Sequence, residues 1–250
     1  MKFWDIKAAA DKTAEVYIYG DIVSDKWDDT EVSAASFNES LKELGEVDTL
    51  NIYINSYGGS VFQGQAIYSI LKRHSAKKNV YIDGIAASIA SLIAMAGDTI
   101  YMPENAMMMV HRPWGVVIGN AQDMRKEADA LERILSAMIP AYMAKVGQKT
   151  DEFTLLELVD AETWLTAEDA FKYGFADEIT KEQAVAASAA PEIIDRYTNM
   201  PETAKALLKK EAKSKEPGPS QKEGLATEDL RKRRLLSEAA VIKTMFDPTK

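Results

Sequence analysis

The amino-acid sequence predicts an α/β fold built around a mostly parallel β-sheet. β-prone runs at residues 15–20, 49–55 and 79–84 alternate with helical patterns, and such alternation is typical of βαβ units, whose strands lie parallel. The chain has 250 residues, which is enough to bury one sizeable core. We expect one domain over residues 1–181, followed by a flexible, charged tail over residues 182–250.

The individual elements of this domain follow from local patterns. A helix is expected within residues 28–45, because small and apolar residues recur there at helical spacing and Gly45 follows. Residues 84–98, GIAASIASLIAMAGD, resemble a buried helix, since none of them is charged before the last. The other expected elements are a helix at 60–73, strands at 98–103 and 106–115, a long helix at 121–146 that contains Pro140, and a helix at 166–174 capped by Thr166.

The predicted tail differs in composition from the rest of the chain. Residues 209–224 are charged and interrupted by Pro and Gly, which is typical of a linker, and residues 225–246 could form an isolated amphipathic helix. Residues 201–250 contain 12 Lys and Arg against 8 Asp and Glu, whereas the whole chain carries −9, so the first 200 residues carry −13. An acidic body argues against nucleic acid as the main ligand.

Composition also excludes several kinds of site and location. The chain has no cysteine and only two histidines, His74 and His111, which excludes disulfides, thiolate metal sites and multi-histidine zinc sites. No metal or organic cofactor is implied, and we expect neither. No apolar run approaches the roughly 20 residues that span a bilayer, and the first residues lack the apolar core of a signal peptide. The sequence thus predicts a cytoplasmic protein without membrane contact.

A glycine pair, Gly58-Gly59, follows the β-prone run at 49–55. The stretch from Gly59 has the G-x4-G spacing of a phosphate-binding loop, but Gln65 and Ala66 stand where Lys and Ser or Thr are needed, so an ATPase is rejected. Paired glycines at such a position can expose backbone N–H groups to an anion or a peptide. Taken alone, the pair favours a plain strand-to-helix turn.

Ser88 and His111 are the candidate reactive side chains. Ser88 lies where a strand is expected to end and a helix to begin. At such a position the N–H groups of Ser88 and Ile89 are unpaired donors, which suits them to bind an oxyanion. His111 ends an apolar run and precedes a loop that contains Pro and Gly, where α/β folds often place catalytic groups. Each residue alone also fits a structural role, and His74, at a helix end beside Lys72 and Arg73, is interpreted as structural.

Four ordered segments resemble the Clp protease proteolytic subunit, a self-compartmentalising serine peptidase, from about residue 14 to 181. These segments are YINSYGGSV, GIAASIAS, PENAMMMVHRPWG and TWLTAEDAFKYGFADEI. The resemblance implies the spiral of βαβ units that these peptidases share with crotonases, and a Ser88–His111–Glu162 triad. It further implies an oxyanion hole from the N–H groups of Gly59 and Ile89, and an extended peptide bound along Gly58, Ser60, Val61, Trp114 and Gly115.

Three departures from the usual family pattern indicate the phage and prophage branch, which is associated with prohead maturation. Tyr57 replaces a proline, Glu162 replaces an aspartate, and residues 111–123 are less glycine-rich than usual. The implied assembly is a homo-oligomer of heptameric or stacked rings. Its candidate partners are protein or peptide substrates, capsid, scaffold or portal proteins, and an ATP-driven unfoldase, although these departures put an unfoldase in doubt.

Two other functions compete with this interpretation. A crotonase-like acyl-CoA enzyme would share the fold and use paired backbone amides, although such an enzyme needs no Ser88–His111 pair. A non-catalytic capsid or scaffold component would have no use for an intact Ser, His and carboxylate set. Asp160 is the rival of Glu162 for the third position, and the alignment of TWLTAEDA favours Glu162.

Overall fold

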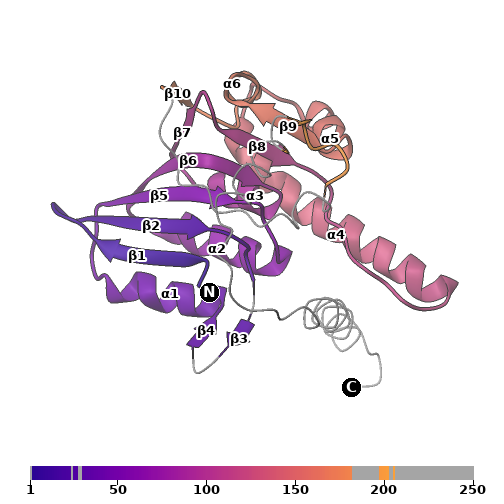
Figure 1. Ribbon diagram of the computed structural model, residues 1–250, viewed down its shortest axis with the longest axis horizontal. Helices are drawn as coiled ribbons and strands as arrows, with labels where there is room; N and C mark the ends of the chain where they lie inside the picture. Colours follow the sequence, from indigo (N-terminus) through magenta and orange to yellow (C-terminus); the bar gives the residue numbers. More distant parts are fainter. Residues whose placement is uncertain (1, 24, 28–29, 182–196, 203–204, 206–250) are drawn as a thin grey trace, which may run out of the picture. The chain divides into compact units, whose positions relative to one another are not determined.

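The computed structural model describes residues 2–23, 25–27, 30–181, 197–202 and 205 (Figure 1). The chain divides into two compact units, which we describe separately. The first unit comprises Met1–Arg112 and Ala137–Ser214, and the second comprises Pro113–Ser136 and Lys215–Lys250. The linker at 209–224 and the helix expected at 225–246 lie outside the described residues.

The first unit is built on a mixed sheet whose main path is mostly parallel. Its strand order is β1-β2-β5-β6-β7-β10, with β8 paired to β6 and β9 paired to β8. The β1–β2 and β8–β9 pairs are antiparallel and the others are parallel, which confirms the predicted fold class. The strands are β1 (Trp4–Ala8), β2 (Thr13–Tyr19), β5 (Thr49–Ser56), β6 (Lys77–Ala87), β7 (Thr99–Pro103), β8 (Met107–Val110), β9 (Thr163–Thr166) and β10 (Glu178–Thr180), beside a separate pair, β3 (Asp25–Trp27) and β4 (Thr30–Val32).

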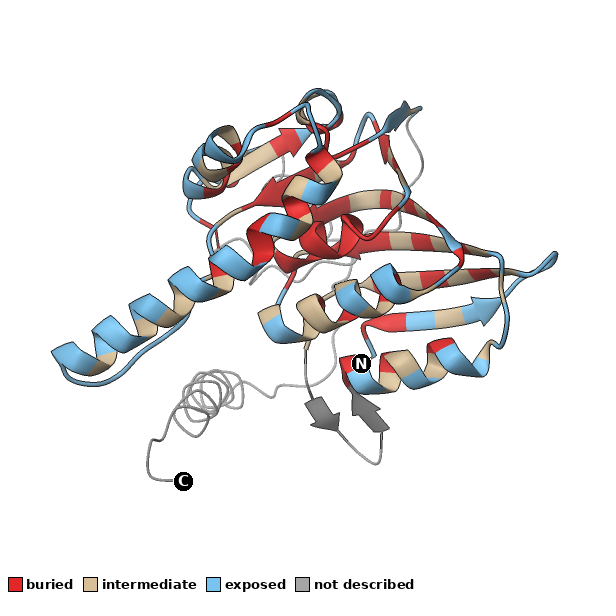
Figure 2. Cartoon of the chain, turned by 180° about the vertical axis from the view of Figure 1, so that it is seen from behind, coloured by how far each residue is buried: buried red, intermediate tan, exposed pale blue. Residues whose placement is uncertain are grey.

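The helices lie largely over one face of this sheet, as the view from behind shows (Figure 2). They are α1 (Ala34–Glu43), α2 (Val61–Arg73), α3 (Ile89–Ala94), α5 (Glu152–Asp160), α6 (Ala167–Tyr173) and the part of α4 (Ala121–Val146) that belongs to this unit. Because successive side chains of a strand point to opposite faces, the two faces of the sheet carry different residue types. One core row, with every side chain fully buried, consists of Val16, Ile52, Val80 and Ile100.

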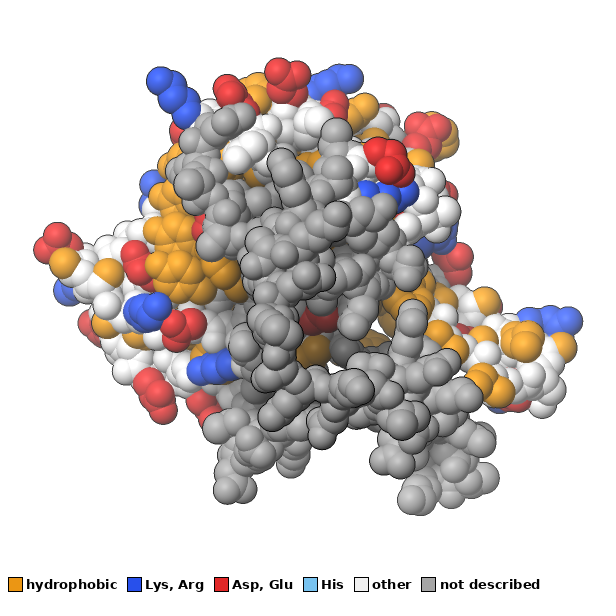
Figure 3. All heavy atoms as spheres, viewed as in Figure 1, with side chains coloured by type: hydrophobic (Ala, Val, Ile, Leu, Met, Phe, Trp, Pro, Cys, Tyr) orange, Lys and Arg blue, Asp and Glu red, His pale blue; other side chains and the backbone are white. Residues whose placement is uncertain are grey.

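The opposite face carries a row of tyrosines in register on four neighbouring strands. Tyr17, Tyr53, Tyr81 and Tyr101 are half-buried, and successive rings stack with centroids 4.9, 5.1 and 4.9 Å apart. These separations match the spacing of neighbouring strands. Hydrophobic side chains gather over the sheet on this side (Figure 3).

Two of the expected elements differ in the structure. The helix expected within residues 28–45 begins only at Ala34, because the Ser33 side chain accepts a hydrogen bond from the N–H of Ser36 and caps it. Residues 84–87, expected to be helical, are the end of β6, because residues 85–87 pair with 107–109 of β8. The helix that follows is therefore short, from Ile89 to Ala94.

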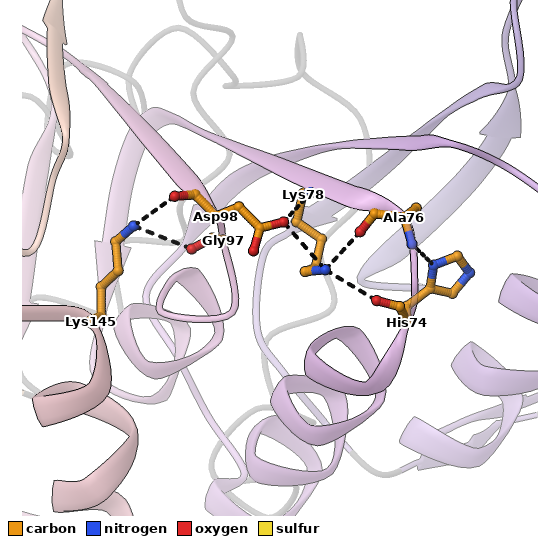
Figure 4. A network of polar contacts seen from close by, with 6 residues as sticks. All are labelled: His74, Ala76, Lys78, Gly97, Asp98 and Lys145. Carbon is orange, nitrogen blue, oxygen red and sulfur yellow. Dashed lines mark hydrogen bonds and ion pairs between the residues drawn. The ribbon is translucent and has the colours of Figure 1, made fainter.

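A polar network joins the end of α2 to the starts of β6 and β7 and the end of α4 (Figure 4). Lys78 Nζ donates hydrogen bonds to the carbonyls of His74 and Ala76 and lies 3.4 Å from Asp98 Oδ2. The His74 ring accepts a hydrogen bond from the N–H of Ala76. Lys145 Nζ donates to the Asp98 carbonyl. This network gives His74 a structural environment.

The described part of the second unit, residues 113–136, consists of an extended segment followed by the first turns of α4. The Asn120 side chain accepts hydrogen bonds from the N–H groups of Gln122 and Asp123 and so caps the helix. The division between the units falls after Ser136, whose carbonyl cannot receive the usual helical bond because Pro140 has no N–H. Exposed apolar side chains of this unit are Trp114, Val116, Val117, Ile118 and Met124.

Candidate active site

Ser88 lies at the junction of β6 and α3. Its backbone has φ 56° and ψ −131°, an unusual conformation for a residue with a side chain. Such strain persists where the surrounding structure enforces it and is concentrated at functional sites. The N–H of Ser88 donates to the Met109 carbonyl at 2.9 Å. The sequence-based expectation that this N–H is unpaired is therefore wrong, because the pairing of β6 with β8 continues to Ser88.

His111 follows β8 directly and contacts Ser88. The β6–β8 register pairs Ala87 with Met109, which brings the two residues after these strand ends close together. His111 Nε2 lies 2.7 Å from Ser88 Oγ. Burial lowers the pKa of His111 below its ordinary value, and the negative charge of Glu162 partly offsets this shift. The ring is therefore neutral at pH 7 and able to accept a proton from the serine.

The glycine turn after β5 packs against Ser88. A Cβ atom on Gly58, whose φ is +91°, would lie 2.7 Å from Ser88 Cβ and 3.2 Å from the nitrogen of Ile89. Any side chain at Gly58 would therefore displace the serine. The Gly58 N–H donates to Ser56 Oγ, which in turn donates to the Gly20 carbonyl. Sequence reasoning missed Ser56, although a serine between an apolar strand and a glycine pair was a visible signal.

The next residues of the turn are tied to Ile22, another residue that sequence reasoning missed. A Cβ atom on Gly59 would lie 2.2 Å from the Ile22 carbonyl oxygen, which already accepts the N–H of Ser60 at 2.7 Å. The Ser60 N–H is thus engaged within the protein, and Val61 begins α2. Ile89 is the first residue of α3, so its N–H has no acceptor within the helix. An oxyanion hole from Gly59 and Ile89 stays a prediction.

Two carboxylates lie near His111 and have different partners. The β8–β9 register pairs Val110 with Thr163, so Glu162 and His111 adjoin the same end of this strand pair. Asp160 instead ends α5 and accepts a hydrogen bond from Arg112 Nε at 2.6 Å. Glu162 Oε1 accepts a hydrogen bond from the N–H of Asn199 at 2.7 Å. Among the described residues, no hydrogen bond joins the His111 ring to either carboxylate.

Residues 197–200 reach this site, although they lie beyond the predicted end of the domain. Tyr197 packs edge-on against the His111 ring, with centroids 5.6 Å apart. Tyr197 and Met200 are both buried. The sequence carried no signal for these contacts, because the segment is short and separated from His111 by more than 80 residues.

Other predicted residues lie elsewhere. Ser91, the obvious alternative nucleophile in the same segment, is fully buried, and its Oγ contacts the Ser88 carbonyl and the Tyr142 hydroxyl. Trp114 and Gly115 belong to the second unit, so a role for them in binding substrate stays a prediction. Within the described segments, no three His, Asp or Glu side chains form a cluster suited to a metal ion. In the same segments, none of the helices has the length and apolar character needed to cross a membrane.

Comparisons with known proteins give a family and a fold for this chain. A family model described as Clp protease matches residues 3–183. A solved structure of a point mutant of ClpP1 from Listeria monocytogenes is 24% identical over 68% of this chain and 92% of its own, with a TM-score of 0.57. At this identity the structural likeness supports the fold.

Proposed function

The chain belongs to the Clp protease family, whose model covers residues 3–183, and from this premise we propose that it is a serine endopeptidase. Ser88 is the nucleophile of the proposed triad, His111 the general base and Glu162 the acid. The single observation that carries this proposal is the 2.7 Å contact between His111 Nε2 and Ser88 Oγ. A crotonase-like enzyme would have no need of this pair.

The proposed reaction is acyl transfer through a covalent intermediate. Neutral His111 takes the proton of Ser88 as Oγ attacks the peptide carbonyl carbon, and the carbonyl oxygen becomes an oxyanion held by the N–H groups of Gly59 and Ile89. His111 then gives its proton to the leaving amine as the C–N bond breaks. Water, activated by His111, releases the acyl group and restores Ser88.

The proposed substrate is an extended segment of a protein chain. The glycine turn next to Ser88 contains Gly58, and it is followed by Ser60 and by Val61 at the start of α2. Backbone pairing with an extended peptide is a general mode of recognition. We further propose that the enzyme acts as a homo-oligomer of rings, as members of this family do. Prohead maturation is the proposed process, supported by Tyr57 and Glu162 at positions where the family usually has other residues.

The peptidase proposal is tested by labelling with a fluorophosphonate and by hydrolysis of short fluorogenic peptides. Ser88→Ala should fold normally, lose all labelling and reduce turnover by at least about 10³-fold. Ser91→Ala is the matched control. It should keep Ser88 labelling, although the loss of the buried contact with Tyr142 should cost about 1–3 kcal/mol of stability. Labelling that survives in Ser88→Ala but vanishes in Ser91→Ala would contradict the assignment.

The prohead proposal needs a separate experiment. Capsid and scaffold proteins of the proposed phage should be shortened when they are expressed with the active enzyme, and should stay intact with Ser88→Ala. Intact masses measured by mass spectrometry decide between the two results. Unchanged masses in both samples, with peptides still hydrolysed, would reject this role and leave the peptidase assignment standing.

A further inference from the structure

The segment Tyr197–Met200 lies on the proposed catalytic residues, beside α5 and β9 (Figure 1, orange). Its contacts involve three parts of the site. The Tyr197 ring packs against His111 and against Trp164, with centroid distances of 5.6 and 5.5 Å. The Tyr197 hydroxyl donates a hydrogen bond to the carbonyl of Tyr57, immediately before the glycine turn. The Asn199 N–H donates to Glu162.

We propose that Tyr197–Met200 is an autoinhibitory clasp. It covers His111, and its hydrogen bond engages the carboxylate of Glu162, which His111 needs as its partner in the triad. The proposal rests on the proposed peptidase function of the same site. The clasp occupies the site in the resting chain, and its release allows the Ser88–His111–Glu162 triad to form completely.

The first support for the clasp is the depth at which its side chains are buried. Tyr197 is 7% exposed and Met200 is 3% exposed, values typical of a core. Both pack in one apolar cluster with Ile85, Ala87 and Met109, which belong to the two strands that carry Ser88 and His111. A segment that merely passed over the surface would not bury its apolar side chains between these strand ends.

The second support is the state of Glu162. Its Oε1 accepts the Asn199 N–H at 2.7 Å, and the Asn199 side chain donates to the neighbouring carbonyl of Ala161 at 2.9 Å. Hydrogen bonds to a carboxylate are about twice as strong as those between neutral groups. The His111–Ser88 contact is present, whereas no described residue accepts a hydrogen bond from the other ring nitrogen of His111. The structure therefore has a paired serine and histidine beside an acid bound to the clasp.

The third support is that the clasp can leave without disrupting the fold. Tyr197–Met200 is neither helix nor strand and adds no partner to the sheet. Among the described residues, the buried side chains of Tyr197 and Met200 and the hydrogen bonds of Tyr197 and Asn199 attach it, so it can open locally while the strands stay paired. An inhibitory segment needs this balance, because the closed form must be favoured but reversible.

An opposite role for the same contacts would be to position Glu162 for catalysis. The two roles predict changes of opposite sign when the contacts are removed. Loss of a positioning contact lowers activity, and so does general destabilisation. Loss of an inhibitory contact raises activity, because a larger fraction of the molecules is competent.

The test uses full-length variants. Asn199→Pro removes the N–H that binds Glu162, and Asn199→Ala is the matched control because it keeps this N–H and loses only the side-chain bond to Ala161. The rates measured are those of fluorophosphonate labelling at Ser88 and of short-peptide hydrolysis. Asn199→Pro combined with Tyr197→Ala should raise both rates on the order of tenfold, and Asn199→Ala combined with the same Tyr197→Ala should raise them less.

A second measurement adds the segment back. A synthetic peptide with the sequence of residues 197–202, YTNMPE, should inhibit the double variant, and the same peptide with alanine in place of its tyrosine should not. Unchanged or slower labelling of the variants, with wild-type Ser88 still labelled, would overturn the clasp alone. An absence of labelling at Ser88 in every variant would overturn the proposed peptidase function, and the clasp with it.

Discussion

The surroundings of Ser88 and His111 suit the roles proposed for these two residues. The positive φ of Ser88 arises where the chain leaves β6 and enters α3 immediately, with Gly58 packed against the serine. Burial keeps the His111 ring neutral, and the nearby carboxylate of Glu162 favours the protonated ring of the proposed reaction. A base that is neutral at rest and stabilised when charged suits the proposed acyl transfer.

The pH dependence of kcat/KM follows from these pKa shifts. His111 must be neutral to act as a base, so kcat/KM should rise with pH through the pKa of His111, which burial lowers below its ordinary value near 6.5. Glu162→Gln removes a negative charge that raises this pKa. The acid limb should therefore move to lower pH while the plateau falls by roughly 10²–10⁴-fold.

Asp160→Asn is the matched control for this measurement. Asp160 forms a partly exposed ion pair with Arg112, and such pairs contribute only about 0–1 kcal/mol. The plateau and the acid limb should both stay close to those of the wild type. A larger loss in Asp160→Asn than in Glu162→Gln would transfer the proposed role to Asp160.

At the scale of elements, the strand-turn-helix unit from β5 to α2 places the glycine turn against the start of α3. Gly58→Ala should abolish peptide hydrolysis, because the new Cβ atom would lie 2.7 Å from Ser88 Cβ. Gly45→Ala is the control, since Gly45 also has a positive φ, +71°, but nothing within 4 Å of the added atom. Both variants should lose about 1–2 kcal/mol from backbone strain, measured by denaturant unfolding. Full activity in Gly58→Ala would contradict this prediction, because it would show that the turn shifts to accommodate the added Cβ atom.

The elements that the sequence predicted well are those whose signals are local. The alternation in β2 and β5 and the long helical pattern of α4 fix these elements without reference to the rest of the chain. Residues 84–87 were expected in a helix because small apolar residues fit either structure, and only the distant strand β8 makes them a strand. Pairing between distant segments decided this case.

The same distinction applies to the candidate site. Ser88 and His111 could be selected by type and position, and their contact is consistent with that choice. The partners of the two carboxylates could not be predicted, because Arg112 and Asn199 meet Asp160 and Glu162 only through folding. No residue spacing and no local composition in the sequence indicates either contact.

At the scale of the whole molecule, the second unit displays apolar side chains on a short stretch of chain. Trp114 is 56% exposed, Ile118 77% and Met124 51%. Exposed apolar groups concentrated in this way are characteristic of interaction surfaces. In a family whose members form ring oligomers, the simplest partner is a second copy of the same chain.

We therefore predict that this stretch contributes to assembly. Trp114→Ser combined with Ile118→Ser should reduce the molar mass measured by light scattering at micromolar concentration, because burial of their apolar surface on association contributes about 25 cal/mol per Å². Phe153→Ser is the control, since Phe153 is 70% exposed but lies on α5 in the first unit. The control should keep the wild-type mass. A wild-type chain that is monomeric and fully active would reject the ring, whereas an oligomer unaffected by the double variant would place its contacts on another surface.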